Sequence, residues 1–182
     1  MQTLKLLACA LAVAVTAFTS AAAQDQQHAA DNTKWGKYII TELPPPSAAD
    51  KAAQDAEDAT LGARVKDMTR SVLELNDKVA KGSYYTDVAW IMKANPDHVW
   101  VKEHSHPFAE VLGFFGSDPE HPNELNAVIE ISIDGEKHVL TKSALIFVPK
   151  NVKHCPLTIK KIDRPVLFFT TGPTSSYDID RK

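Results

Sequence analysis

The sequence predicts an all-β fold built as one domain, either a small sandwich or a barrel. From Val72 onward, apolar and aromatic residues come in short runs, and turn residues such as 95–97 and 134–135 separate these runs. Short apolar runs at regular spacing with turn signals between them are typical of antiparallel β architectures. The chain has 182 residues, of which 44% are hydrophobic and 24% charged, so it can bury one sizeable core.

We expect strands near 84–92, 98–105, 110–115, 126–133, 136–141, 144–148, 154–160 and 165–171. The pair Asp134-Gly135 is the sharpest local signal, because a two-residue turn of this type closes a hairpin of fixed register. Three pairs then share one face of the hairpin: Ile133 with Glu136, Ile131 with His138, and Ile129 with Leu140. That face is mostly apolar, so it is predicted to point inward and to carry His138 with it.

The N-terminal segment is typical of a secretory signal peptide. A short region with one Lys is followed by an apolar run over 6–18 and by small residues that end at Ala23. The apolar run is too short for a comfortable transmembrane helix. We therefore expect cleavage of residues 1–23 and a periplasmic mature protein. Residues 24–34 are interpreted as a flexible leader and residues 35–182 as the single domain.

The start of the domain carries weaker signals. Residues 35–43 favour a short strand that the prolines 44–46 stop. The Ala-rich segment 47–59 has no large apolar residue, so it predicts a short helical or irregular insert at the surface. Cys155 is the one cysteine outside the signal segment, so no internal disulfide is expected. We interpret Cys155 as a small buried residue.

The formal net charge of −3 argues against nucleic acid and against an anionic membrane surface as the main partner. A small-molecule ligand or substrate is the partner that we expect.

One group of residues carries metal-binding chemistry. His104 and His106 are two apart, so in a strand both imidazoles project to one side. Pro107 bends the chain, and a hairpin here brings the Glu110 carboxylate beside them. His154 follows a turn and starts a later strand. Three imidazoles and one carboxylate suit one divalent transition metal, with iron, manganese, zinc, copper and nickel all admissible.

These residues resemble the two motifs of the cupin superfamily. His104, His106, Glu110 and Gly116 resemble the first motif, with one residue fewer than usual before the glycine. Pro149, Asn151 and His154 resemble the second. Asn151 stands where glycine is usual and tolerates the same left-handed turn. Ser143 and Thr158 replace two further motif positions that are not usual metal ligands. The resemblance covers residues 82–172.

The resemblance implies a small jelly-roll β-barrel with a metal inside, held by His104, His106, Glu110 and His154. The alternative is a barrel that carries these residues without metal. For His138 we weigh an acid/base role near the metal against a core histidine bonded to a carbonyl, and the core role is favoured. Tyr84 and Tyr85 open a strand and are assigned to core packing, with a pocket wall as the alternative.

Three functions remain open. The first is a metal-dependent enzyme, with dioxygenase-like oxidation as the commonest cupin precedent and isomerase or lyase activity as variants. The second is a non-catalytic periplasmic module that binds a metal or a small ligand. The third is an oligomerisation scaffold, since the resemblance implies that homodimers are common.

Overall fold

The computed structural model describes residues 34–46, 48, 51–52 and 68–177. The predicted signal peptide 1–23, residues 24–33 of the leader and most of the insert 47–59 lie outside the described residues. The chain divides into two compact units, 1–37 and 38–182, and all the strands belong to the second. Within the described ranges, no helix combines the length and the apolar character that a membrane span requires.

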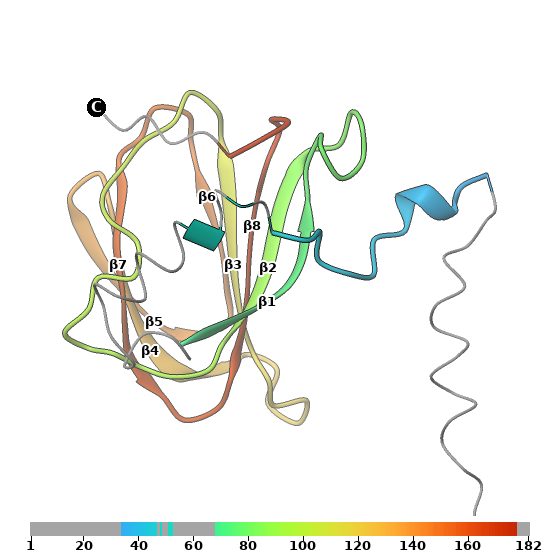
Figure 1. Cartoon of the computed structure of the whole chain (residues 1–182). Coiled ribbons are helices and arrows are strands. Elements are labelled where there is room, and N and C mark those ends of the chain that lie inside the picture. The colour runs from blue at the N-terminus through green and yellow to red at the C-terminus, as the bar shows by residue number, and fades with distance from the viewer. Residues whose placement is uncertain (1–33, 47, 49–50, 53–67, 178–182) are drawn as a thin grey trace, which may run out of the picture. The chain divides into compact units, whose positions relative to one another are not determined.

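In the part of the chain that the structure describes, eight strands form two antiparallel sheets (Figure 1). The first sheet has the order β1-β2-β8-β3-β6 and the second the order β5-β4-β7. The strands are β1 Thr69–Leu75, β2 Tyr85–Ile91, β3 Glu110–Gly116, β4 Glu124–Ile133, β5 Glu136–Lys142, β6 Ala144–Val148, β7 His154–Ile162 and β8 Val166–Gly172. The predicted all-β, jelly-roll type of fold is therefore confirmed.

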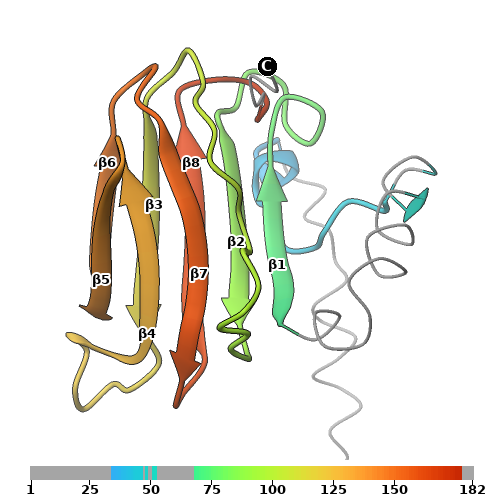
Figure 2. The same ribbon diagram turned by 90° about the vertical axis from the view of Figure 1, so that its left-hand side faces the viewer.

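The core lies between the two sheets. Figure 2 shows the smaller sheet in front of the β8-β3-β6 part of the larger one. Alternate residues of β4 are buried, and Ile129 and Ile131 are fully inaccessible. They share one cluster with Phe114 of β3 and Phe168 of β8, and Cys155 is buried in the same cluster as expected. Removal of this apolar surface from water is the main stabilising contribution.

The hairpin of β4 and β5 forms in the predicted register. Ile133 pairs with Glu136, Ile131 with His138 and Ile129 with Leu140. Asp134 and Gly135 adopt φ angles of 48° and 83°, which is the left-handed pair that a tight hairpin turn requires.

The predicted inward position of His138 is wrong. Its side chain is exposed, because β5 is the edge strand of the smaller sheet and that face is uncovered along most of its length. His138 therefore neither lines a pocket near the cluster nor lies in the core.

Three local predictions also differ from the structure. Residues 98–105 form no strand but only two isolated bridges to β7, since turns near His98 and Pro107 leave too few consecutive residues for a ladder. Residues 35–43 hold the 3-10 turn η1 Gly36–Tyr38 instead of a strand. Strand β1 went unpredicted because it is an edge strand whose exposed residues break any apolar alternation.

Candidate metal centre

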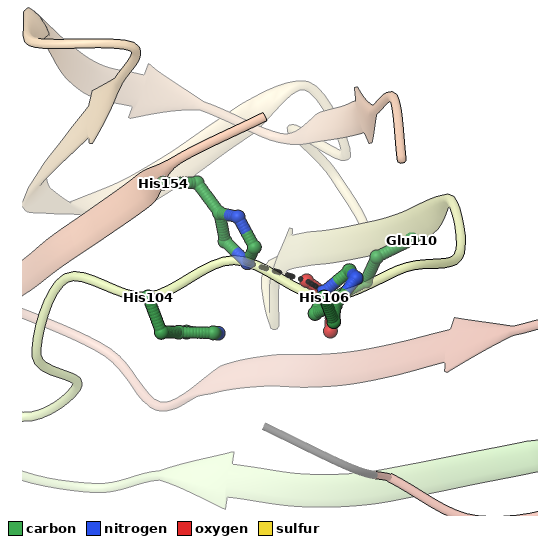
Figure 3. Close-up of side chains that lie close together, drawn as sticks. All are labelled: His104, His106, Glu110 and His154. Atoms are coloured by element: carbon green, nitrogen blue, oxygen red, sulfur yellow. Dashed lines mark hydrogen bonds and ion pairs between the residues drawn. The ribbon is translucent and has the colours of Figure 1, made fainter. Parts of the chain in front are cut away.

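The side chains of the four predicted ligands lie close together (Figure 3). His104 and His106 precede β3, Glu110 opens β3, and His154 opens β7. One potential ligand atom from each residue lies within 4.8 Å of the other three. His106, Glu110 and His154 are each only 1% exposed, whereas His104 is partly exposed. Three of the four clustered residues are therefore buried, and the cluster comes closest to solvent at His104.

Backbone hydrogen bonds bring the two motifs together. The N–H of His104 donates to the carbonyl of His154 at 3.0 Å, and the N–H of His154 donates back at 2.9 Å. The N–H of Asn151 donates to the carbonyl of His106 at 2.8 Å. Asn151 has a φ of 64°, so the left-handed turn expected at this position is present. This turn and the paired bridge place His154 opposite the HxH segment.

The glycine at position 116, in the first motif, is required because no larger residue fits there. It ends β3, where a Cβ atom would collide with the backbone carbonyl oxygen of Glu124 at the start of β4. The glycine therefore lets the two sheets approach each other closely at the end of β3.

All three imidazoles are oriented by the same kind of contact. The Nδ1 atoms lie 2.8 Å from the Lys102 carbonyl for His104, 2.7 Å from the Phe108 carbonyl for His106, and 3.0 Å from the Val152 carbonyl for His154. A carbonyl only accepts, so each Nδ1 carries the proton and donates. In a neutral ring the lone pair is then on Nε2. Such second contacts are what fixes the tautomer and orientation of a metal-binding histidine.

Glu110 is held as a carboxylate. Its Oε1 accepts hydrogen bonds from the Tyr85 hydroxyl at 2.8 Å and from the Thr170 hydroxyl at 2.6 Å. Burial favours a raised pKa for Glu110, but its interactions with His154, Thr170 and Tyr85 outweigh burial and lower the pKa to about 2. The other oxygen, Oε2, stays directed at the histidines.

At the centre of the cluster, a carboxylate oxygen lies close to imidazole nitrogens, and all of these atoms are hydrogen-bond acceptors when the rings are neutral. Glu110 Oε2 lies 3.0 Å from Nε2 of His154 and 3.4 Å from Nε2 of His106. Nε2 of His154 is buried without a hydrogen-bond partner among the described residues. Buried acceptors in this arrangement need a cation between them or a proton on one ring. Three Nε2 atoms and one carboxylate oxygen are a fitting donor set for a divalent transition metal.

The pKa values of two of the histidines shift in opposite directions. Burial lowers the pKa of His154, but the adjacent Glu110 carboxylate and the Val152 carbonyl outweigh burial and raise it. For His104, burial dominates and lowers the pKa, which favours the neutral ring that a metal requires.

The sequence did not indicate Thr170 or Tyr177 as neighbours of the cluster, and it indicated Tyr85 only as a core residue or a pocket wall. Tyr85 is 1% exposed and bonds Glu110, so the core assignment was right for its burial but missed its polar role. Its neighbour Tyr84 is 65% exposed, so its assignment to the core was wrong. Thr170 comes from β8, and the Tyr177 hydroxyl lies 2.8 Å from Nε2 of His104. No local pattern marks residues that meet only because distant strands are neighbours in a sheet.

A cavity of about 380 Å³ adjoins this part of the molecule. Tyr85 and Tyr177 line it, but none of the four clustered residues does. Glu74, Asp77 and Asp87 contribute carboxylates to its wall. Burial is the main reason why the pKa of Asp87 rises to about 6.

Jelly-roll sheets, with the residues of both motifs gathered at one buried point, are the arrangement that the resemblance implied. The fold of this chain is cupin-like. No family model matches the chain, and a comparison with curated proteins finds no match.

Solved structures that match the chain include several cupins. An oxalate oxidase in complex with glycolate has 10% identity and a TM-score of 0.42, over 63% of this chain and 55% of that one. An RmlC-like cupin from Shewanella frigidimarina has 20% identity and a TM-score of 0.32, over 50% and 67%. A cupin protein from Bacteroides fragilis has 20% identity and a TM-score of 0.41, over 60% and 83%. The chain thus spans little more than half the length of the oxalate oxidase.

Proposed function

We propose that this cupin-like protein binds one divalent transition metal through His104, His106, Glu110 and His154. The observation that supports it best is one buried pair of acceptors: among the described residues Nε2 of His154 has no hydrogen-bond partner, and it lies 3.0 Å from Oε2 of Glu110. Each histidine is already held with its Nε2 directed inward by a backbone carbonyl. The site is therefore preorganised, so ordering the ligands costs little when a metal binds.

We further propose that the protein is a metal-dependent oxidoreductase, dioxygenase-like, that acts on a small organic molecule. A bound transition metal supplies Lewis-acid or redox chemistry. Four protein donors leave further positions for other ligands on metals that prefer six. The partly exposed His104 marks the side on which a small molecule reaches the cluster. Glu110 contributes one fixed negative charge, because Tyr85 and Thr170 hold its other oxygen.

A non-catalytic metal- or ligand-binding module is the second candidate. It is favoured by the Tyr177 hydroxyl, which bonds His104 at the same partly exposed side. A site whose most exposed ligand is already bonded by a side chain suits storage or sensing better than turnover. Rapid oxidation of a substrate from a panel of catechols, thiols and keto acids supports the enzyme. Tight binding of such a compound without turnover supports the module.

The proposed location is the periplasm, on the strength of the signal-peptide pattern in residues 1–23. Expression of the full chain in a Gram-negative host tests this location. The proposal expects a periplasmic product whose N-terminus is Gln24, and an uncleaved cytoplasmic product contradicts it.

Metal content per chain tests the proposed metal site. The protein is purified without chelator and without a nickel column, beside a His104→Ala/His154→Ala variant and a His138→Ala variant. We expect close to one metal per chain in the wild type and in His138→Ala, because His138 is exposed and outside the cluster. The double variant should be empty. Protein that stays empty after reconstitution, or a double variant that retains its metal, contradicts the proposal.

A further inference from the structure

Tyr177 reaches the cluster from the segment that follows β8. The N–H of Tyr85 donates to the carbonyl of Thr174 at 2.7 Å, and the N–H of Asp77 donates to the carbonyl of Ser175 at 3.0 Å. These bonds tie the segment to β2 and to the loop after β1. Tyr177 is therefore carried by backbone that the sheet holds in place up to two residues before it.

The ring of Tyr177 lies among the rings of the site. Its centroid is 5.3 Å from that of Tyr85, 6.1 Å from that of His106 and 6.2 Å from that of His104. Edge contacts of this kind favour one orientation of the phenol. The hydroxyl then lies 2.8 Å from Nε2 of His104.

The direction of that hydrogen bond follows from the other side of the ring. Nδ1 of His104 donates to the Lys102 carbonyl at 2.8 Å, so the lone pair of the neutral ring is on Nε2. A phenol at neutral pH carries its proton and donates it. The Tyr177 O–H therefore occupies the lone pair through which His104 would bind a metal. A single lone pair cannot accept a hydrogen bond and bind a metal at the same time.

We propose that Tyr177 is a latch residue, whose hydroxyl holds His104 in the metal-free protein and must leave it when a metal binds. This inference rests on the proposed metal site. Among the four ligands, His104 is also the one nearest solvent, so the latch acts where a metal ion enters. The cavity of about 380 Å³ that Tyr177 lines gives the displaced ring space to move.

If Tyr177 is a latch, removing its hydroxyl should raise the metal affinity. If Tyr177 supports the site, the same change should lower the affinity or leave it unchanged. Removing the hydroxyl takes away a competitor for His104, so a Tyr177→Phe variant should bind metal more tightly. The expected gain is about two- to tenfold in affinity, the factor that one net hydrogen bond corresponds to. A phenol that ligated the metal, or merely supported the site, would give weaker or unchanged binding.

The experiment is a titration of chelator-treated mature protein with Co²⁺, followed by the absorbance of the bound ion. Wild type is compared with Tyr177→Phe and with Tyr84→Phe, because Tyr84 is 65% exposed and is not one of the four clustered residues. We expect tighter binding in Tyr177→Phe only. Equal or weaker binding in that variant, while the wild type binds Co²⁺, overturns the latch and leaves the metal site standing.

Thermal unfolding with and without Co²⁺ provides the second measurement. The latch exists only in the metal-free state, so Tyr177→Phe should lower the melting temperature of the metal-free protein and not that of the loaded protein. An equal loss in both states indicates ordinary packing and contradicts the proposal. If neither wild type nor Tyr177→Phe binds Co²⁺, the proposed metal site fails and the latch fails with it.

Discussion

His104 and His154 belong to different motifs, and each donates its backbone N–H to the carbonyl of the other, at 3.0 and 2.9 Å. This isolated bridge is the only pairing that His104 makes with a strand in the described residues. It fixes the separation of two imidazoles whose ring centroids are 4.2 Å apart. The geometry of the cluster is therefore set by the backbone before any side chain binds a metal.

Metal addition should stabilise the folded protein. A ligand that binds only the native state at a concentration one hundred times its Kd adds about 2.7 kcal/mol, or roughly 5–10 °C in Tm for a domain of this size. Differential scanning calorimetry with Zn²⁺ and then with EDTA measures the shift. The His104→Ala/His154→Ala protein should show none, and a shift of equal size in that variant would assign the effect to another site.

Loss of the Tyr85 hydroxyl should destabilise the metal-free protein. The hydroxyl donates to the buried Glu110 carboxylate, and hydrogen bonds to charged groups contribute about 1.5–3 kcal/mol. Urea unfolding of Tyr85→Phe should show a loss in that range. Tyr84→Phe, at an exposed position, should stay within about 0.5 kcal/mol of wild type. Equal effects of the two substitutions would mean that the bond to Glu110 contributes nothing.

The turn at Asn151 should tolerate glycine and resist alanine. Its φ of 64° lies in the left-handed region, which costs an ordinary residue roughly 1–2 kcal/mol. The free energy of unfolding of Asn151→Gly should therefore be higher than that of Asn151→Ala by about that amount. Because this turn leads into His154, the alanine variant should also bind Co²⁺ more weakly. If alanine equals glycine in both measurements, the turn does not control the site.

Asp87 should make the metal-free protein less stable as the pH rises. Burial, with smaller contributions from Glu74 and Glu110, raises the folded-state pKa of Asp87 to about 6 from an ordinary value of 3.8. Between those two values the folded state binds more protons than the unfolded state, so stability falls as the pH increases. Asp87→Asn should remove this slope and gain about 1 kcal/mol at pH 7, less than the whole pKa shift corresponds to, because the carboxyl is partly exposed and solvent screens it. Denaturant unfolding across pH 4–7 measures the difference, and parallel curves for the two proteins would contradict it.

The sequence by itself determined the features that depend on residue type and on short spacings along the chain, namely the hairpin register and the set of candidate metal-binding side chains. Asp134-Gly135 specified the hairpin register because its two residues accept left-handed φ angles, and that register is present. His104, His106, Glu110 and His154 were identifiable as a donor set from residue type and spacing, and the structure brings them within 4.8 Å. The resemblance to the second cupin motif implied a turn at Asn151, and the sequence showed that asparagine can adopt the backbone that this turn requires.

Only the tertiary structure decided which side chains are buried and which meet at the cluster, because both depend on neighbours that are distant in the chain. His138 shares a face with buried Ile131, yet it is exposed, because β5 is an edge strand and a residue's burial depends on what covers its strand. Tyr85 and Thr170 reach Glu110 because the sheet places β8 between β2 and β3, and Tyr177 reaches His104 from the segment after β8. Strand order follows from packing the whole core, and no local pattern of residue types carries that information.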